Sequence, residues 1–481
     1  MAYLLNLLYL LLILLALPWL VYQSIRKGKY REGFAAKFLG RVPRRESRKP
    51  CLWLHAVSVG EVNLVAPLLR MIEHERPDWE CVLSTTTMTG MAVAKRKYPS
   101  LLVFYCPLDF TWAVRAAMRR IRPDVLVLAE LELWPNLIRA AKQSGARVAV
   151  INGRLSEHSF RGYRRIRPLV AWLLAQVDLI AVQDEVYAER FRQLGARPET
   201  VAVTGSLKYD GAQTDRNNPA TERLRQLAGF AREDAIFLAG STQDPEEEAA
   251  LAAFCQLRER WPQLRLVLVP RHPDRFEAVA RMLDSSGVPW QRRSALGDGW
   301  RVAGGGGRGQ RAAGGGQRAE QSGPPHPLTP SPPHPVTPSS PATHHPSPRV
   351  LLVDAVGELG AWWGTAQIAL VGGSFGNRGG QNMIEPAAYG AAVSFGPNTW
   401  NFRDIVTAML AHDAAAVVNG PAELTAFLRR CLEDPDYAAG LGRRAQALVL
   451  SQLGATRQTF DRLAPLVEHP SQEPRDGRAA A

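Results

Sequence analysis

Short apolar runs alternate with amphipathic stretches along most of this chain, and this alternation restricts the fold more than any other feature. In the first half the runs are residues 52–55, 81–84, 101–105, 125–128, 147–151, 179–182 and 201–203. In the second half they are residues 236–239, 264–269, 350–353, 368–371 and 392–394. Strands that alternate with helices are typical of parallel sheets covered by helices on both faces. The sequence therefore predicts the α/β class, with two Rossmann-like doubly wound domains.

The boundaries between these domains follow from length and from changes in composition. A chain of 481 residues is too long for a single core. The polar segment 215–221 separates a first domain, residues 30–214, from a second domain, residues 222–452. Residues 453–481 are predicted to form a C-terminal helix, which we expect to cross back onto the first domain, and a frayed tail. Ligands favour the cleft at such a domain junction.

One segment of the second half does not fit the alternating pattern. Residues 303–348 are dominated first by Gly and Arg, then by Pro, His, Ser and Thr. Such a composition buries too little apolar surface to offset the entropy of ordering. We predict a disordered insertion within the second domain, and the sequence leaves its role open.

Residues 4–21 are apolar except for Asn6 and Pro18. This length is just enough to cross a hydrocarbon layer of about 30 Å as a helix. Arg26, Lys27 and two further basic residues follow directly, which predicts that the rest of the chain stays in the cytoplasm. Residues 1–25 are therefore expected to be an N-terminal transmembrane anchor. The alternatives are a buried core helix and a helix lying in the membrane surface.

The chain is basic, with a formal net charge of +13. This charge suits nucleic acid, anionic lipid or a phosphorylated substrate, but no zinc-finger spacing or aromatic RNA-binding motif favours nucleic acid. Arginines gather in two groups in the first domain, which favours anionic lipid: Arg115, Arg119, Arg120 and Arg122, then Arg154, Arg161, Arg164, Arg165 and Arg167. The five scattered cysteines indicate reduced thiols rather than a disulfide framework or a metal site.

Two acidic segments follow predicted strands of the first domain. Glu61 lies in the turn between strand 52–55 and a helix, where ligands bind in open parallel sheets. On position alone a helix-start charge is favoured over a general base for this residue. Glu130 and Glu132 follow strand 125–128 and so share the same sheet edge, where one acid can act as base and another as charge stabiliser.

Two segments of the second domain have features of an anion site. Arg271 follows strand 264–269 with Pro270 and His272 on either side, and an arginine there can grip a phosphate, although a surface arginine is equally consistent. The segment 372–386 is rich in glycine, which lets backbone N–H groups approach an anion. It has neither the Walker nor the dinucleotide fingerprint.

Six segments of the chain together resemble the motifs of the Kdo transferase family. They are residues 55–61, 130–136, 239–242, 270–272, 356–359 and 372–386. Kdo is 3-deoxy-D-manno-oct-2-ulosonic acid, which these lipid A-modifying enzymes transfer from CMP-Kdo to a lipid A precursor in Gram-negative bacteria. The resemblance covers most of residues 30–465, with the motifs in order and similarly spaced. It implies the GT-B fold, an N-terminal membrane anchor and donor binding by the second domain.

The resemblance also implies roles for individual residues. Glu61 would deprotonate the acceptor hydroxyl, and Glu130 and Lys208 would assist the transition state. The CMP moiety would be held by Pro270, Arg271, Val356, Gly357, Glu358, Asn382, Met383, Ile384 and Glu385. Since Arg271, Lys208 and a helix N-terminus can stabilise the departing CMP, we expect no metal and no cofactor, with CMP-Kdo as a co-substrate.

The expected function is an inverting transfer of Kdo to lipid IVA in lipopolysaccharide biosynthesis. The expected location is the cytoplasmic face of the bacterial inner membrane, with an anionic lipid surface as partner and no nucleic acid. Two alternatives stay open: a GT-B enzyme that uses another nucleotide sugar, and a non-catalytic membrane scaffold. The sequence does not give the number of Kdo residues transferred, the oligomeric state or the arginines that contact the acceptor phosphates.

Overall fold

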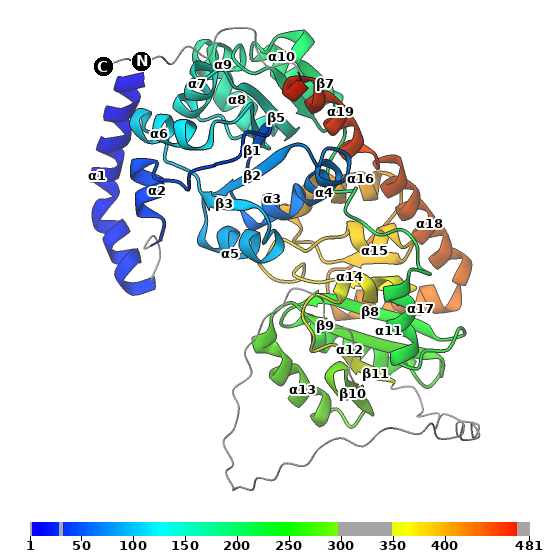
Figure 1. Cartoon of the computed structure of the whole chain (residues 1–481). Coiled ribbons are helices and arrows are strands. Elements are labelled where there is room, and N and C mark those ends of the chain that lie inside the picture. Colours follow the sequence, from blue (N-terminus) through cyan, green and yellow to red (C-terminus); the bar gives the residue numbers. More distant parts are fainter. Residues whose placement is uncertain (1, 28–31, 297–348, 469–481) are drawn as a thin grey trace, which may run out of the picture.

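The computed structural model describes residues 2–27, 32–296 and 349–468, which form two lobes stacked end to end (Figure 1). The first lobe contains a seven-stranded sheet in the order β3-β2-β1-β4-β5-β6-β7, and the assigned pairings within it are all parallel. Its strands are β1 (Cys51–His55), β2 (Glu80–Thr85), β3 (Leu102–Tyr105), β4 (Val125–Ala129), β5 (Arg147–Gly153), β6 (Leu179–Val182) and β7 (Val201–Val203).

The second lobe repeats this plan with a seven-stranded sheet in the order β10-β11-β9-β8-β12-β13-β14. Its assigned pairings are also parallel. Its strands are β8 (Ala235–Thr242), β9 (Leu264–Pro270), β10 (Trp290–Arg292), β11 (Val350–Leu352), β12 (Ile368–Val371), β13 (Ala392–Phe395) and β14 (Ala416–Val417). The predicted two-domain, Rossmann-like architecture is therefore confirmed.

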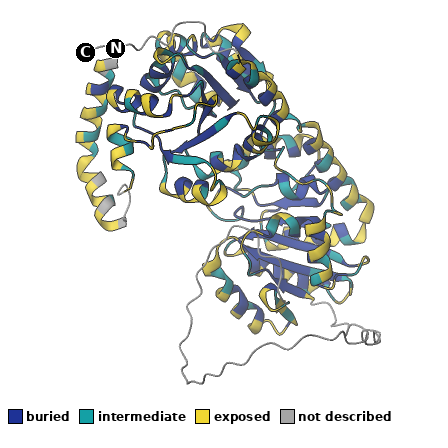
Figure 2. Ribbon diagram, in the orientation of Figure 1, coloured by how far each residue is buried: buried dark blue, intermediate teal, exposed yellow. Residues whose placement is uncertain are grey.

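Helices cover both faces of each sheet (Figure 1). Those of the first lobe are α2 (Phe34–Leu39), α3 (Val59–Leu64), α4 (Ala66–Glu75), α5 (Met88–Lys97), α6 (Thr111–Ile121), α7 (Pro135–Gln143), α8 (Glu157–Arg165), α9 (Arg167–Leu174) and α10 (Glu185–Gln193). Those of the second are α11 (Pro219–Leu227), α12 (Glu246–Leu257), α13 (Phe276–Ser285), α14 (Leu359–Trp362), α15 (Ile384–Ala388), α16 (Arg403–Ala411), α17 (Pro421–Glu433) and α18 (Pro435–Ser451). Because both faces are covered, the central strands are buried along their length (Figure 2).

The last helix, α19 (Ala455–Glu468), returns to the first lobe, as predicted (Figure 1). Its buried side chains Phe460, Leu463 and Val467 belong to the same apolar cluster as Leu52 and Leu54 of β1. The Phe460 ring lies 6.1 Å from the ring of Trp79, centroid to centroid. One layer of the first domain's core is thus supplied by the end of the chain.

The predicted N-terminal helix exists as α1 (Ala2–Lys27), but its prediction as a transmembrane anchor is not supported. In the part of the chain that the structure describes, no helix is both long and apolar enough to cross a membrane. Polar residues of α1 instead bind the first lobe. Asn6 Nδ2 donates to Thr111 Oγ1 at 2.7 Å, and Tyr9 Oη donates to Asp109 Oδ2 at 3.1 Å. Asn6, which interrupts the apolar run, is therefore a docking residue.

The predicted disordered insertion, residues 303–348, lies outside the described residues. On either side of it, β10 and β11 pair in parallel, so the sheet continues across the insertion. All five cysteines are free, and Cys51, Cys81, Cys106 and Cys431 are buried, as expected for structural thiols.

Candidate active site

The three residues predicted to be catalytic gather at the carboxyl edge of the first sheet. Glu61 lies in the first turn of α3, directly after β1, and Glu130 directly follows β4. These two strands are hydrogen-bonded neighbours, so both carboxylates leave the sheet at one edge. Lys208 follows β7 and reaches back until its Nζ lies 3.9 Å from Glu130 Oε1.

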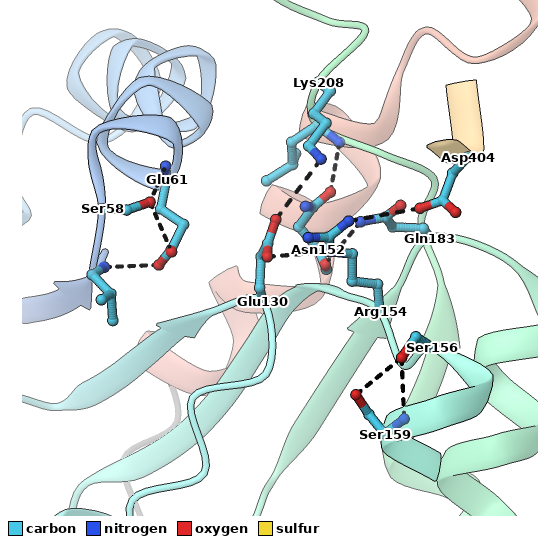
Figure 3. Close-up of polar contacts among 12 residues, drawn as sticks. Ser58, Glu61, Glu130, Asn152, Arg154, Ser156, Ser159, Gln183, Lys208 and Asp404 are labelled. Atoms are coloured by element: carbon cyan, nitrogen blue, oxygen red, sulfur yellow. Dashed lines mark hydrogen bonds and ion pairs between the residues drawn. The ribbon is translucent and has the colours of Figure 1, made fainter. Parts of the chain in front are cut away.

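Glu61 is held by the start of its own helix (Figure 3). Ser58 is the N-cap residue, and its hydroxyl accepts a hydrogen bond from the Glu61 N–H and donates one to Glu61 Oε1 at 3.0 Å. The Val57 N–H donates to Glu61 Oε2 at 2.7 Å. This arrangement resembles a capping box, in which a Ser and a Glu three residues later satisfy unpaired N–H groups. Glu61 therefore caps the start of α3, and the same hydrogen bonds fix the orientation of its carboxylate.

The environment of Glu61 raises the pKa of its carboxyl from 4.5 to about 7. Burial is the largest cause, the charges of Glu130 and Glu132 act in the same direction, and the hydrogen bonds from Val57 and Ser58 oppose them. A general base works best with a pKa near the pH at which it operates. A carboxyl with this pKa in a cleft has the property expected of a base that takes a proton from a sugar hydroxyl.

Glu130 is flanked by two cations. Its backbone has φ of 56°, a left-handed conformation that is uncommon for a residue with a side chain. Arg154 Nε lies 3.2 Å from Glu130 Oε2, and Lys208 approaches the other carboxylate oxygen (Figure 3). Burial and the charge of Arg154 lower the pKa of Lys208, while the charges of Glu130, Asp404 and Glu61 raise it. The carboxylates therefore help to keep the lysine positively charged.

Asn152 holds the loop next to this cluster through hydrogen bonds. The sequence analysis did not identify this residue. The residue is fully buried, with φ of 52°, at the end of β5. Its Oδ1 accepts a hydrogen bond from the Leu207 N–H at 3.0 Å, and its backbone oxygen accepts one from Gln183 Nε2 at 3.1 Å (Figure 3). Asn152 thereby fixes the loop that carries Lys208. Its position after a predicted strand, followed by Gly153 and Arg154, was the available sequence signal.

In the second domain, Arg271 and Glu385 are brought together. Arg271 directly follows β9, and its N–H donates to Thr242 O at the end of β8. Asn382 Nδ2 donates to Glu385 Oε1 at 3.0 Å. Burial raises the pKa of Glu385, and the hydrogen bond from Asn382 and the positive charge of Arg271 oppose this effect. Arg271 and Glu385, both predicted to hold the CMP moiety, therefore lie close enough for their charges to interact.

Several other predicted donor-binding residues have buried side chains, whereas that of Val356 is exposed. Met383 and Ile384 are buried in the core of the second domain, and Pro270 is buried at the end of β9. Val356 is exposed, and Gly357 has φ of 95°. At Pro270, Met383 and Ile384 a nucleotide would therefore contact mainly main-chain groups, whereas at Val356 it could also contact the side chain.

The Glu358 side chain points into the protein. It forms a buried, bidentate ion pair with Arg293, with Arg293 Nε 2.9 Å from Oε2 and the terminal nitrogen NH2 2.8 Å from Oε1. Trp362 Nε1 also donates to Glu358 Oε2, at 3.2 Å. This pairing fixes the segment 356–358 against the end of β10.

The expectation that the glycine-rich turn offers its N–H groups to a ligand anion is wrong for three of them. The N–H groups of Gly373, Ser374 and Phe375 donate to the buried carboxylate of Glu246, at 2.7 to 3.0 Å. A side chain at Gly372 would overlap Ser241 O and the Thr242 backbone, so glycine is needed there. The anion that this turn binds is therefore the Glu246 carboxylate, which belongs to the first turn of α12.

A polar cavity of about 370 Å³ adjoins this turn at the carboxyl edge of the second sheet. Its lining includes Gln243, His272, Arg275, Gly373 and Arg378. Arg275 is held by a bidentate ion pair with Glu247, at 3.1 Å for both hydrogen bonds. His272, Gly373 and Arg378 fall within segments that the sequence analysis identified, whereas it missed Gln243 and Arg275, which stand in polar turns without a recognisable spacing.

The acids at the carboxyl edge of the first sheet lie close to the second domain. Arg154 of the first domain lies 3.7 Å from Asp404 of the second, from its terminal nitrogen NH1 to Oδ2 (Figure 3). The charge of Asp404 also acts on Lys208, so this edge of the first sheet lies at the junction of the domains. That the anion-binding turns of the second domain line the same cleft stays a prediction.

Comparison with known proteins identifies the family. The family model described as 3-deoxy-D-manno-octulosonic-acid transferase (kdotransferase) matches residues 31–211. Over 459 residues the chain is 30% identical to the 3-deoxy-D-manno-octulosonic acid transferase of Bordetella pertussis, covering 92% of this chain and 94% of that protein. The chain belongs to the Kdo transferase family. The enzyme of the same description from Haemophilus influenzae is 28% identical over 448 residues, with the same coverage of 92% and 94%. The predicted family is thus confirmed, and the chain is a glycosyltransferase.

A solved structure supports the GT-B fold of this Kdo transferase family member. The UDP-GlcNAc 2-epimerase from Neisseria meningitidis bound to UDP-GlcNAc matches with a TM-score of 0.52, over 86% of this chain and 99% of that one. The two sequences are 11% identical, so the likeness concerns the fold alone.

Potential metal ligands are dispersed in this family member. Among the residues that the structure describes, no group of three or more His, Cys, Asp or Glu side chains could hold a metal ion. Positive charge beside Glu130 comes from Arg154 and Lys208, and such side chains can stabilise a phosphate through charge-assisted hydrogen bonds.

Proposed function

We propose that this protein transfers Kdo from CMP-Kdo to a lipid A precursor of the lipid IVA type, in lipopolysaccharide biosynthesis. The observation that supports this proposal most directly is the Glu61 carboxyl, with its pKa near 7, in a cluster with Glu130 and Lys208 that adjoins the second domain through Arg154 and Asp404. The match to Kdo transferases over almost the whole chain supports the choice of sugar.

The reaction we propose is a single displacement that inverts the anomeric carbon of Kdo. Glu61 takes the proton of the acceptor hydroxyl while the hydroxyl oxygen attacks the anomeric carbon. The bond from that carbon to the CMP phosphate breaks, and CMP leaves with the electron pair. A base on one face and the leaving group on the opposite face are the arrangement that inversion needs, and a positioned base contributes about 10²–10⁴-fold.

Two groups of cations stabilise the negative charge of the reacting groups in the proposed reaction. Arg271 lies beside the predicted nucleotide site and stabilises the phosphate of the departing CMP. Lys208 and Arg154 hold Glu130, which keeps positive charge close to the anomeric centre and to the Kdo carboxylate. Because these cations supply the charge stabilisation, we propose that the transfer needs no metal ion and no cofactor.

The helix α1 is proposed to place the enzyme on the cytoplasmic face of the inner membrane. Its apolar side chains Leu7, Leu14, Leu15 and Ile25 are 64% to 70% exposed. Much of the helix is coloured as exposed in Figure 2. An apolar helix face bordered by basic residues binds anionic lipid surfaces. The lipid surface is therefore the occupant we assign to this face, and it would bring the lipid acceptor to the cleft.

The experiment that tests the proposal is mass analysis of the product formed from CMP-Kdo and lipid IVA. We expect a mass increase by whole Kdo units, and the size of the increase gives the number transferred. EDTA is expected to leave the rate unchanged. Turnover of UDP-sugars without turnover of CMP-Kdo would contradict the proposal, and so would a complete loss of activity with EDTA that a divalent cation restores.

The membrane proposal has a separate test, because it does not depend on the reaction. The protein should float with vesicles that contain anionic phospholipid, and a variant with Leu14→Ser and Leu15→Ser should float markedly less. A variant that floats as well as the unmodified protein would contradict the role of α1.

A further inference from the structure

Arg154 is shared between the two domains at the active site. It follows β5 in the first domain, where its Nε lies 3.2 Å from Glu130 Oε2. Its terminal nitrogen NH1 lies 3.7 Å from Oδ2 of Asp404, which occupies the first turn of α16 in the second domain (Figure 3). One guanidinium thus connects the carboxylate of Glu130 to a carboxylate carried by the donor-binding domain.

The segment that carries Asp404 is attached to the glycine-rich loop of the second domain. Three residues before Asp404, Asn401 donates from its N–H to Gly379 O at 3.0 Å and from Nδ2 to Arg378 O at 2.8 Å. Arg378 lines the polar cavity at the edge of the second sheet. The loop, Asn401 and Asp404 therefore form a continuous connection from the cavity to Arg154.

We propose that Arg154 is a positioning residue that couples domain closure to catalysis: the approach of Asp404 orients its guanidinium so that Glu130 and Lys208 adopt their active arrangement. This inference rests on the proposed function, since it assigns a role within the Kdo transfer reaction. Glu130 and Lys208 act in the cleft, and Arg154 acts through them.

The strengths of the two contacts suit this role. Arg154 and Asp404 are 41% and 57% exposed, and an ion pair between such solvated groups is weak. It can therefore break and re-form as the domains move. Glu130 is only 20% exposed, and its contact with Arg154 is shorter. Arg154 is thus expected to keep its contact with Glu130 while its ion pair with Asp404 breaks and re-forms.

The charge of Asp404 extends beyond Arg154. It raises the pKa of Lys208, as do Glu130 and Glu61, against the lowering by burial and by Arg154. It also contributes to the raised pKa of Tyr209 in the same loop. The second domain therefore supplies a negative charge that helps to keep Lys208 protonated when the cleft is closed.

Asp404→Asn tests this coupling, with Asp436→Asn as a matched control. Both aspartates lie in the first turn of a helix of the second domain, so both changes remove the same favourable interaction with a helix N-terminus. Only Asp404 faces Arg154. We expect Asp404→Asn to lower kcat by about tenfold with little change in the KM for CMP-Kdo. Asp404→Glu should restore part of the rate, and Asp436→Asn should retain it.

Two further measurements separate positioning from a merely structural effect. With Asp404→Asn, the alkaline limb of the kcat profile should move to lower pH, because Lys208 loses a neighbouring negative charge while Glu130, Glu61 and Arg154 remain. At a pH where Lys208 is protonated in every variant, Asp404→Asn should have no further effect on kcat in a chain that already carries Arg154→Gln.

The inference is overturned if Asp404→Asn behaves as Asp436→Asn does, or if the losses from Arg154→Gln and Asp404→Asn simply multiply. These outcomes differ from failure of the proposed function, in which the unmodified protein transfers no Kdo from CMP-Kdo at all.

Discussion

Glu61 combines a structural and a chemical role, and a single substitution separates them. Glu61→Gln keeps an oxygen that can accept from the Val57 N–H but removes the base. We expect kcat to fall by about 10²–10⁴-fold, the contribution of a positioned base. Transfer of Kdo by the purified variant at saturating donor measures this loss. Unchanged turnover would favour the non-catalytic scaffold.

The folding control for this variant follows from the sign of the pKa shift. Folding raises the pKa of Glu61 from its ordinary value of 4.5 to about 7. The contribution of Glu61 to the free energy of unfolding is therefore fully present below pH 4.5 and is lost as the pH rises through about 7. At pH 8 the native state thus holds an unfavourable charge. Glu61→Gln should therefore have a Tm at pH 8 equal to or above that of the unmodified protein, so that lost activity cannot be attributed to unfolding.

The pH dependence of the reaction provides a second prediction at this scale. Since Glu61 must be ionised to accept a proton, kcat should rise as the pH increases through about 7, the pKa that burial produces. Part of this pKa comes from the charge of Glu132, so Glu132→Gln should move the acidic limb of the profile to lower pH. Glu157→Gln, an exposed position on α8, serves as the control. Coincident acidic limbs for these two variants would contradict the assignment.

Individual site residues were predictable where sequence places them directly after a strand. Glu61, Glu130 and Arg271 were identified in this way, because the ends of parallel strands meet at one edge. Asn152 and Asp404 were not, since their roles arise from contacts with Leu207 and Arg154, which are distant in sequence. The inward orientation of Glu358 likewise depends on its partner, Arg293, on the other side of the insertion.

At the scale of single elements, the glycine-rich turn shows how a helix start can organise a loop. Glu246 is 1% exposed and accepts hydrogen bonds from three successive N–H groups of the turn. A glutamine there would place an amide NH₂ against these donors. We expect Glu246→Gln to lower the free energy of unfolding of the second domain by about 2–4 kcal/mol, because buried N–H groups lose a charged acceptor.

The matched control for this prediction is Glu248→Gln. Glu248 lies in the same first turn of α12 but is exposed, so it shares the helix-start position without the buried contacts. Urea denaturation of both variants measures the difference. Equal midpoints would show that the turn holds its shape without the carboxylate.

The strands themselves were predicted nearly to the residue where they are buried. The prediction of residues 179–182 matches β6, and that of 368–371 matches β12, since runs of Leu, Ile, Val and Ala mark strands covered on both faces. The strands β10 and β14 were missed. Both are short edge strands of three and two residues. The strand β10 contains Gln291 and Arg292 and so produces no apolar run, and β14 occupies only two residues of the short apolar segment 414–418. The anchor prediction for α1 failed because composition does not reveal which face of a helix contacts protein.

At the scale of the whole molecule, the two parallel-sheet domains could be predicted, but the extent to which the first domain depends on the other end of the chain could not. The helical pattern of α19 suggested that it crosses back, yet only the structure shows how much core it supplies. Asp210 accepts hydrogen bonds from the N–H groups of Gly454 and Thr456, which fixes the point where the chain turns back. Arg457 then pairs with Glu75 of α4. The first domain is therefore completed by residues that lie beyond the second.

This arrangement predicts that a substitution near the C-terminus destabilises the N-terminal sheet. Leu463 of α19 is 1% exposed and packs in the cluster that includes Leu52 and Leu54 of β1. Leu463→Ala leaves a cavity in that cluster, and we expect it to lower the stability of the first domain by about 2–5 kcal/mol. Hydrogen exchange should show faster exchange of the β1 and β4 amides, with those of β12 unaffected. Leu450→Ala, at a 48% exposed position on α18, is the control. Since domains usually fold around their own cores, equal protection of β1 in the two variants would mean that α19 only covers a core that is complete without it.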